Sequence, residues 1–404
     1  MDQPYKPPLT TPLYKILPQE PLLLMGAGPV PIPTAVAHAN GVVINHLGDT
    51  MNQVVGELKR MAQYAFQTNS DKVMGVAGPA SAAMEMGITN LLWPGRKVLA
   101  LVNGTFSARM GCMAEAVGAE VDYIRAEEPS PLDLDEIKAQ LAKKKYDVVT
   151  LVQGETSCGI CNYNLPEIVA ACKEQGALVM LDAVVTLTTM PMWMDSWDID
   201  VVVTGGQKGI SSIPGVSLIA FSKAAWDVVE SRTASMPHWC LDARKAYRFW
   251  GHQQYHYTAP VPGILALYEA LRLICEETLQ KRFMRHKRSS EALQAGIEAM
   301  GLELFVPKEF RLNSVVSIKV PKGIDAYQVR KHMAEKFSVE ISGAFGLDIV
   351  RIGQMGEQCR SHALFKTLYA MGMAFRQLGY SGNVAAGMAA LENILGADLN
   401  DFVP

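Results

Sequence analysis

Short apolar runs alternate with stretches of helix length through the middle of this chain, and this alternation constrains the fold most strongly. The runs are apolar at consecutive positions, which is typical of strands buried on both faces of a sheet. They are Lys97–Asn103, Glu120–Arg125, Asp147–Gln153, Ala177–Asp182, Ile199–Thr204 and Val216–Ser222, and helix-length stretches at Ser107–Gly118, Asp133–Lys144 and Leu165–Gly176 separate the first four. Strands alternating with helices predict an α/β fold, with a mostly parallel sheet covered by helices on both faces.

The length of 404 residues exceeds what one hydrophobic core usually organises, so we expect two domains behind an arm. Residues 1–24 are rich in proline and predict an extended arm, exposed to solvent or laid across a partner. Residues 25–277 would form the large domain, and residues 278–404 a smaller α+β domain. The patterns also predict helices at Asp49–Gln67, Asp325–Phe337 and 361–397, one long or kinked helical region at Pro262–Met300, and strands at Leu312–Val320 and Ile349–Ile352.

Charge and composition exclude several classes of function. Lys and Arg total 37 against 40 Asp and Glu, so the net charge of −3 supplies no basic field for a nucleic acid or an anionic membrane. No apolar run approaches the roughly 18 residues of a membrane-spanning helix, and the N-terminus has no signal-peptide pattern. Seven cysteines, an odd number in a long chain, favour reduced thiols, so we expect a cytoplasmic protein.

Two charged residues follow consecutive apolar runs and carry the strongest chemical signal. Asp182 ends one run, and Lys208 lies just beyond the next. The carboxyl ends of parallel strands meet in one crevice, where open α/β sheets bind their ligands. A lysine and a carboxylate there suit pyridoxal 5′-phosphate, because the lysine can form a Schiff base and the carboxylate keeps the pyridine nitrogen protonated. For this pair alone, a helix-capping Asp and a surface Lys are the alternative.

Two further segments would border the same crevice. VAGPASAAMEMG follows a short apolar run and opens a helix, whose N–H groups and dipole could bind a phosphate near Ala80 and Ser81. An ordinary helix start capped by Ser81 is the alternative. The segment Asn103–Phe106 ends another run and places an aromatic ring at the mouth of the crevice, although core packing is the default for any Phe.

Four segments, in their order along the chain, carry a resemblance to a known family. QGETSCG, LDAV followed by GGQKG, YHYTAPV and RIGQMG resemble the class V, fold-type I aminotransferases, specifically the alanine–glyoxylate and serine–pyruvate group. That group includes ureidoglycine–glyoxylate, aspartate–glyoxylate and pyridoxamine–pyruvate enzymes. The resemblance implies the type I pyridoxal-phosphate transferase fold and a homodimer with active sites at the subunit interface. It also implies transamination from a small amino acid or amine to glyoxylate or pyruvate.

The resemblance further implies roles for individual residues. Lys208 would form the Schiff base and carry the proton, Asp182 would pair with the pyridinium nitrogen, and Arg351 would clamp the substrate carboxylate with its planar fork. The other implied contacts are Val184 and Phe106 on the two faces of the ring, Thr156 at the phenolic oxygen and the substrate, Gln207, Ala80 and Ser81 at the phosphate, Tyr255 and Thr258 at the phosphate of the neighbouring subunit, and Gly26 at the substrate pocket.

The sequence departs from the pattern of this family at two places. In Ala77–Ser81, Pro79 has no N–H and no hydroxyl precedes Ser81, where relatives read Ser-Gly-Thr-Gly or similar. Residues Asn45–Asp49 read NHLGD where many relatives carry His-Arg-Ser, close to the substrate side chain. The phosphate contacts and the amino donor therefore stay open.

Other patterns favour different chemistry. Cys158 and Cys161 form a CxxC that could be redox-active or bind zinc, but no second CxxC or matching His pair accompanies it. His252 and His256 have the spacing of zinc ligands on a helix without the intervening Glu. The basic run Lys281–Arg288 is typical of a solvated helix face. We therefore expect neither a metal site nor a nucleic-acid partner.

Two other functions remain as alternatives on the same fold. One is a pyridoxal-phosphate lyase or desulfurase, although desulfurases carry a histidine over the ring where this chain has Phe106. The other is a binding or structural protein without catalysis. The presence of Lys208, Asp182 and Arg351 together argues against a protein that has lost catalysis.

Overall fold

The computed structural model describes residues 7–396, and its largest sheet has seven strands. These are β2 (Val73–Ala77), β3 (Lys97–Val102), β4 (Glu120–Arg125), β5 (Val148–Val152), β8 (Leu178–Asp182), β9 (Val201–Gly205) and β10 (Val216–Phe221), in the spatial order β2-β10-β9-β8-β5-β3-β4. All neighbouring strands are parallel except where β10 pairs with β2 and β9. The predicted α/β fold with a mostly parallel sheet is therefore confirmed.

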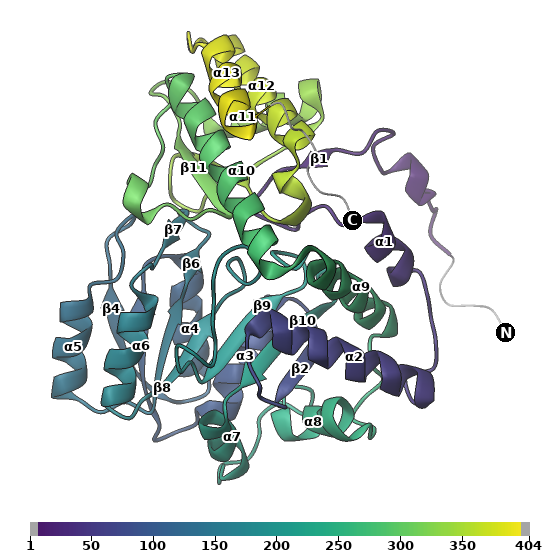
Figure 1. Ribbon diagram of the computed structural model, residues 1–404, viewed down its shortest axis with the longest axis vertical. Coiled ribbons are helices and arrows are strands. Elements are labelled where there is room, and N and C mark those ends of the chain that lie inside the picture. Colours follow the sequence, from purple (N-terminus) through teal and green to yellow (C-terminus); the bar gives the residue numbers. More distant parts are fainter. Residues whose placement is uncertain (1–6, 397–404) are drawn as a thin grey trace.

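Helices pack around this sheet, as the alternating pattern predicts (Figure 1). They are α1 (Thr34–Asn40), α2 (Asp49–Phe66), α3 (Ala80–Leu91), α4 (Thr105–Ala116), α5 (Leu134–Lys143), α6 (Leu165–Glu174), α7 (Lys223–Glu230), α8 (Ala243–His252) and α9 (Val261–Glu277). Strands β5, β9 and β10 are buried at every position, which explains their continuous apolar runs. Asp133 caps α5 and Ser222 caps α7, because each side chain accepts backbone N–H groups of the first turn.

The region predicted as one long or kinked helix over Pro262–Met300 is two helices. Helix α9 ends at Glu277, and α10 (Leu279–Ala299) begins two residues later. Thr278 between them has a φ of +70° and a ψ of 146°, a conformation that no helix contains. This single residue turns α10 away from the sheet and toward the C-terminal helices (Figure 1).

The C-terminal part is built from a small sheet and helices. The sheet has the order β11-β14-β13, formed by β11 (Val315–Lys319), β13 (Ser342–Gly343) and β14 (Ile349–Gly353). Helices α12 (Ser361–Gln377) and α13 (Val384–Leu395) pack with α10, and α11 (Ala326–Phe337) packs with α12. Helices α12 and α13 divide the region predicted as helical over 361–397, of which 397 lies outside the described residues. Short elements complete the described chain: η1 (Leu13–Lys15), β1 (Leu23–Leu24), β6 (Gly154–Glu155), β7 (Ile160–Cys161), η2 (Lys308–Phe310), β12 (Val339–Glu340) and η3 (Gly356–Cys359).

Each of the two parts has a hydrophobic cluster of its own. The larger cluster surrounds the seven-stranded sheet, and the smaller one draws on α10 to α13 and the small sheet. Met25, which the sequence assigns to the large domain, is fully buried in the smaller cluster. It follows β1, whose two residues pair in parallel with β12. The boundary between residues 277 and 278 stays a prediction.

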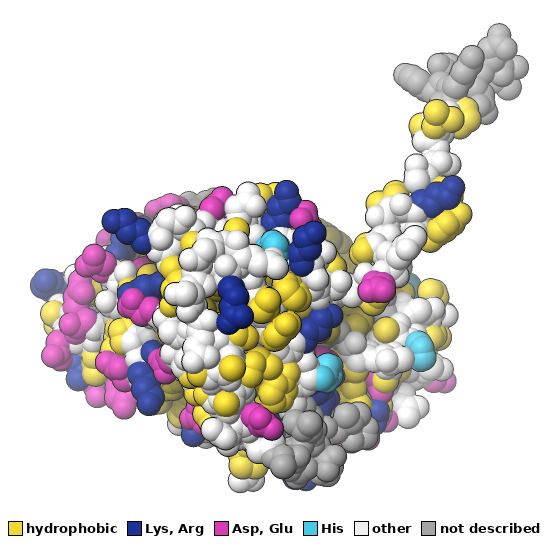
Figure 2. Space-filling model, turned by 90° about the horizontal axis from the view of Figure 1, so that it is seen from above, with side chains coloured by type: hydrophobic (Ala, Val, Ile, Leu, Met, Phe, Trp, Pro, Cys, Tyr) yellow, Lys and Arg dark blue, Asp and Glu magenta, His cyan; other side chains and the backbone are white. Residues whose placement is uncertain are grey.

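The N-terminal segment ahead of β1 extends away from the body of the molecule (Figure 2). Of the predicted arm over residues 1–24, residues 1–6 lie outside the described part of the chain. The segment carries exposed large apolar side chains, namely Leu9, Leu13, Tyr14, Ile16 and Leu17. In residues 7–396, no helix is long and apolar enough to cross a membrane.

Candidate active site

The sheet brings Asp182 and Lys208 to the same edge. Asp182 is the last residue of β8, and Lys208 lies three residues beyond the end of β9. These two strands are parallel neighbours, with Asp182 paired opposite Val203. The crevice at their carboxyl ends is where an open α/β sheet binds its ligand.

Lys208 is mostly buried and is held against the segment that follows β1. Its Nζ donates to the carbonyl of Ala27, and a Cβ placed on Gly28 would lie 2.6 Å from the same nitrogen. Burial, followed by the positive charge of Arg351, lowers the pKa of Lys208 to about 8, with Asp182 opposing this change. A substantial fraction of this amine is therefore neutral near pH 8, as a nucleophilic lysine requires.

Asp182 is 4% exposed and is held by one backbone hydrogen bond. Its Oδ1 accepts the N–H of Val184 at 2.7 Å, which fixes the carboxyl group at the strand end. Burial raises the pKa of Asp182 to about 7, although that hydrogen bond and the charges of Lys208 and Arg109 lower it. A buried carboxyl of this kind favours a nearby cationic group, which would restore its ionised form.

Arg351 approaches this crevice from the small sheet. It lies on β14, is 7% exposed, and donates through Nε to the carbonyl of Gly343 at 2.8 Å and through Nη1 to the carbonyl of Thr156. Burial, as the largest cause, lowers the pKa of this guanidinium, and the carboxylate of Glu155 opposes that change. Its Nη2 also donates to the carbonyl of Gly343, so three of its five N–H groups are engaged by backbone and two remain for another partner.

Glu155 is a residue of this site whose role the sequence reasoning missed. Its carboxylate is fully buried and accepts the N–H groups of Phe106 at 3.0 Å and of Ser107 at 2.9 Å, which caps the first turn of α4. It also accepts the hydroxyl of Ser157 at 2.7 Å. The carboxylate thus fixes the backbone of Phe106, and the buried acidic position within GETSCG was the signal available in the sequence.

The residues predicted for the phosphate gather at the start of α3. A Cβ placed on Gly205 would lie 2.7 Å from Gln207 Oε1 and 2.9 Å from the Cβ of Ala80, so both side chains converge on that glycine. Gln207 Oε1 is buried and unpartnered in the described chain. Ser81 accepts a hydrogen bond from Nη1 of Arg109 at 2.9 Å.

Other predicted site residues lie apart from this group. Tyr255 is 60% exposed and Thr258 is exposed, and within residues 7–396 their contacts do not include Lys208. The Tyr255 ring packs edge-on against His46, with 5.9 Å between the ring centroids. The carbonyl of Gly26 accepts a hydrogen bond from the Gln358 side chain at 2.7 Å, beside the small sheet rather than against the lysine.

The residues at this edge fit pyridoxal phosphate. The glycine at position 28 leaves room for the lysine amine, and any side chain there would occupy the place of that amine. The uncapped start of α3 offers backbone N–H groups to an anion, and the side chain of Gln207 lies beside it. The buried carboxyl of Asp182, with its raised pKa, suits a cationic ring nitrogen.

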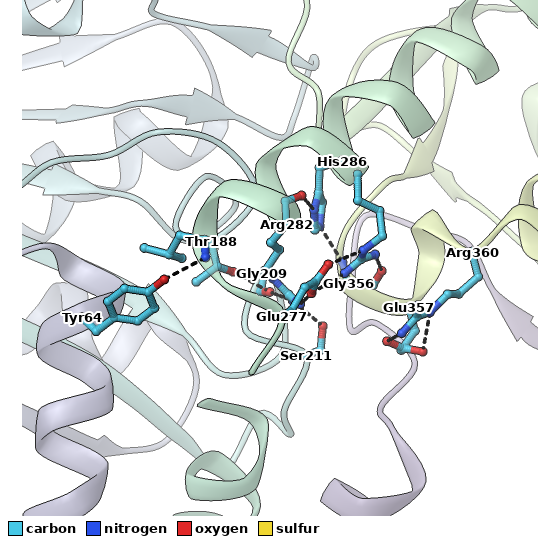
Figure 3. A network of polar contacts seen from close by, with 12 residues as sticks. Tyr64, Thr188, Gly209, Ser211, Glu277, Arg282, His286, Gly356, Glu357 and Arg360 are labelled. Atoms are coloured by element: carbon cyan, nitrogen blue, oxygen red, sulfur yellow. Dashed lines mark hydrogen bonds and ion pairs between the residues drawn. The ribbon is translucent and has the colours of Figure 1, made fainter. Parts of the chain in front are cut away.

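A buried ionic network supports the segment that follows Lys208 (Figure 3). Glu277 accepts hydrogen bonds from Arg282 at 2.8 Å and from Arg285 at 2.6 Å, and Arg282 also donates to the carbonyl of Gly209 at 2.7 Å. Burial alone would raise the pKa of Glu277, but the two arginines lower it to about 2. The network therefore fixes the residue next to the lysine to the junction of α9 and α10.

The same network reaches the segment after Arg351 (Figure 3). Arg285 donates to the carbonyl of Gly356 at 2.7 Å, and the N–H of Gly356 donates to Nε2 of His286 at 2.9 Å. Burial and the neighbouring arginines lower the pKa of His286 far below its usual range, so the ring is neutral and can accept. One cluster thus holds backbone from both parts of the molecule.

The cysteine and histidine pairs show no geometry for a metal. Burial raises the pKa of Cys158 to about 12 and also raises that of Cys161, so both thiols stay protonated. Nε2 of His256 lies 3.0 Å from the carbonyl of Trp239, which gives this ring a structural partner. Among residues 7–396, no three His, Cys, Asp or Glu side chains form a group that could hold a metal ion.

Comparison with known proteins gives concordant results. The family model of class V aminotransferases matches residues 35–361. The alanine–glyoxylate aminotransferase of Drosophila melanogaster is 34% identical over 343 residues, which cover 83% of this chain and 87% of that relative.

Solved structures of the same class share the fold. The ureidoglycine–glyoxylate aminotransferase of Bacillus subtilis matches with a TM-score of 0.90 and 28% identity, over 96% of this chain and 99% of that chain. An alanine–glyoxylate aminotransferase of Nostoc sp. matches with a TM-score of 0.86 and 31% identity, over 91% and 100%. The expected transaminase and the expected type I fold are confirmed, and the family implies pyridoxal phosphate. This chain belongs to the class V aminotransferases.

Proposed function

We propose that this transaminase uses pyridoxal phosphate bound at Lys208 and moves an amino group from a small amino acid or amine to glyoxylate or pyruvate. The observation that carries the proposal is the meeting of Asp182 and Lys208 at the carboxyl ends of two parallel strands, with Arg351 near enough to lower the pKa of the lysine. When bound, the cofactor supplies the electron-accepting ring that transamination needs.

Each of the three residues has a task that its surroundings support. Lys208 holds the cofactor and then moves a proton at the substrate Cα, for which its pKa near 8 is suited. Asp182 keeps a positive charge on the pyridine nitrogen. Arg351 binds the substrate carboxylate with the N–H groups that its backbone contacts leave free, which orients the Cα–H bond.

The residues around these three complete the proposed site. Val184 and Phe106 enclose the ring, Thr156 reaches the phenolic oxygen, and Gln207, Ala80 and Ser81 contact the phosphate. The exposure of Tyr255 and Thr258 in the single chain supports a role at the phosphate of a second subunit, and hence a homodimer. Gly26 lines the substrate side.

The lysine assignment is tested by reduction and peptide mapping. We expect borohydride to fix the cofactor to the peptide containing Lys208 in the wild type, and to fix none in Lys208→Ala. Lys223→Ala serves as the control, because its side chain is 87% exposed on α7. Label on any other lysine, or in the Lys208→Ala protein, would show that the assignment is wrong.

The amino donor is identified by half-reactions. The relatives named above act with alanine and with ureidoglycine. A solved pyridoxamine–pyruvate aminotransferase is 23% identical to this chain, and that likeness supports the shared fold but not a shared substrate. The pyridoxal form is mixed with alanine, serine, aspartate and ureidoglycine, and the loss of its near-visible absorbance ranks the donors. Pyridoxamine is tested separately, as a substrate with pyruvate.

A further inference from the structure

The phosphate end of the proposed site is short of donors at the start of α3. Pro79 precedes the helix and has no N–H, and it makes no side-chain cap. The N–H of Ala82 is already donated to the carbonyl of Pro79 at 2.8 Å. No residue from Val76 to Met84 carries a charge. Two N–H groups and the hydroxyl of Ser81 are then all that the loop offers to a doubly charged anion.

Arg109 brings a positive charge to this place from α4. Its Nη1 donates to Ser81 Oγ at 2.9 Å, so the hydroxyl accepts there and keeps its own proton to donate elsewhere. Among residues 7–396, Arg109 forms no ion pair with a carboxylate. Its remaining N–H groups are available to an anion beside Ser81.

The ring of Phe106 restricts where this guanidinium can go. The Cζ of Arg109 lies 4.8 Å from the centroid of that ring, one turn earlier on α4, which is a cation–π distance. Glu155 fixes the backbone of Phe106 in turn. Burial is the main cause of the raised pKa of Asp182, and Arg109 is among the charges that oppose it, so this cation lies within electrostatic reach of the crevice.

We propose that Arg109 is a binding residue for the cofactor phosphate, and that its charge offsets the N–H missing at Pro79 and the side-chain hydroxyl missing at Ala80. The inference rests on the proposed function, because the phosphate is that of pyridoxal phosphate. Arg109 and Ser81 act together: the arginine orients the hydroxyl and adds charge-assisted hydrogen bonds of its own. The aromatic ring proposed to enclose the cofactor also positions the cation.

The test compares two cofactors that differ only in the phosphate. The full-length chain is freed of cofactor, and binding of pyridoxal phosphate and of pyridoxal is titrated by tryptophan fluorescence. We expect Arg109→Gln to weaken binding of pyridoxal phosphate about 10- to 100-fold, the effect of losing a charged hydrogen-bond partner. Binding of pyridoxal should change by less than about 2-fold, since it lacks the group that Arg109 contacts.

Arg125→Gln is the matched control. This arginine also stacks on an aromatic ring, with its Cζ 4.3 Å from the centroid of Tyr123, but it is exposed on the edge strand β4. It should leave both affinities unchanged. If Arg109→Gln does not fold, Arg109→Lys replaces it, and a preference for pyridoxal phosphate over pyridoxal lowered at least about 3-fold supports the proposal.

Two results would overturn the inference. One is an unchanged affinity for pyridoxal phosphate in the Arg109 variant, and the other is an equal loss for both cofactors, which would make Arg109 a residue that only holds α3 and α4 together. Failure of the wild type to bind pyridoxal phosphate is a different outcome, because it would contradict the proposed function itself.

Discussion

At the scale of single residues, the site is organised by two ionisable groups whose pKa values move toward each other. Burial raises the pKa of Asp182 to about 7 and lowers that of Lys208 to about 8. The folded chain therefore favours the neutral form of each group more than water does. Without a ligand, this burial destabilises the folded chain, because the Asp182 carboxylate is removed from water without a full counter-charge. Binding sites commonly carry such a cost.

This cost gives a pH-dependent prediction for Asp182→Asn in the cofactor-free protein. The folded pKa lies above the ordinary value of 3.8, so the folded chain binds more protons between pH 4 and 7 and its stability falls as the pH rises through that window. The full difference corresponds to about 4 kcal/mol. We expect urea denaturation to show that the free energy of unfolding of the Asn variant rises relative to that of the wild type as the pH increases. Transaminase activity should be lost in this variant.

Asp227→Asn is the comparison for this experiment, because that carboxylate is 58% exposed in an ion pair on the surface of α7. Its stability relative to the wild type should not change over the same range. Unfolding curves for Asp182→Asn that stay parallel to the wild type from pH 4 to 8 would contradict the raised pKa.

The residues of the site were predictable to different degrees. Asp182 and Lys208 could be placed together because strand ends in a parallel sheet meet, whatever the packing details. The contacts of Glu155 and Arg109 depend on how α4 is rotated and on which carboxylate caps it. Neither follows from spacing along the chain. The role of Arg351 came from resemblance alone, and its meeting with Thr156 requires the relative placement of two parts of the molecule.

At the scale of elements, the apolar pattern predicted strands and helices well and their junctions poorly. The six predicted strands of the large sheet are present within a few residues of their expected ends. The division of the region Pro262–Met300 was missed, because a Thr with positive φ leaves no trace in an apolar pattern. The antiparallel direction of β10 was also missed, because β10 is buried at every position, as the parallel strands of such a sheet are.

The junction of α9 and α10 supports a prediction for Glu277→Gln. The folded pKa is about 2, so the carboxylate contributes stability above its usual pKa of 4.5, and that contribution is lost as the pH falls toward 2. The variant leaves Arg282 and Arg285 without their shared partner. We expect the free energy of unfolding at pH 7 to fall by about 3 kcal/mol, measured by urea denaturation.

The neighbouring residue provides the control. Glu276 pairs with Arg272 on the surface and is 47% exposed, so Glu276→Gln should alter stability by no more than about 0.5 kcal/mol. The loss in Glu277→Gln should narrow as the pH is lowered from 5 toward 4. A constant loss over that range would mean that the charge of Glu277 is not its cause.

At the scale of the whole molecule, the proposed active site is incomplete in one chain. Lys208, Asp182 and Arg351 converge, while Tyr255 and Thr258 face solvent. In the proposed two-fold dimer, each subunit would receive the missing pair from its partner. Such sharing between subunits cannot be read from one sequence, and it entered here through resemblance.

Shared sites predict complementation between two inactive variants. In the proposed site, Lys208→Ala subunits would lack the attachment point for the cofactor, and Tyr255→Phe/Thr258→Ala subunits would lack the phosphate contacts that they lend to the partner. In a mixed dimer, one site loses both features and the other keeps both. After unfolding and refolding together, an equal mixture should recover about a quarter of the wild-type activity, since half of the dimers are mixed. Activity no greater than that of the separate variants would place Tyr255 and Thr258 in the site of their own chain.

The pairing of β1 with β12 bears on how this chain is made. Met25 is fully buried in the smaller core, and the N–H of Ala27 donates to Ser342 Oγ across 315 positions of sequence. During synthesis the first of these partners leaves the ribosome long before the second exists. Closing so long a loop is slow, and the smaller core must wait for it. A fragment beginning after α9 would therefore lack β1, the strand that pairs with β12, whereas a circular permutant joining the two ends through a linker could supply it.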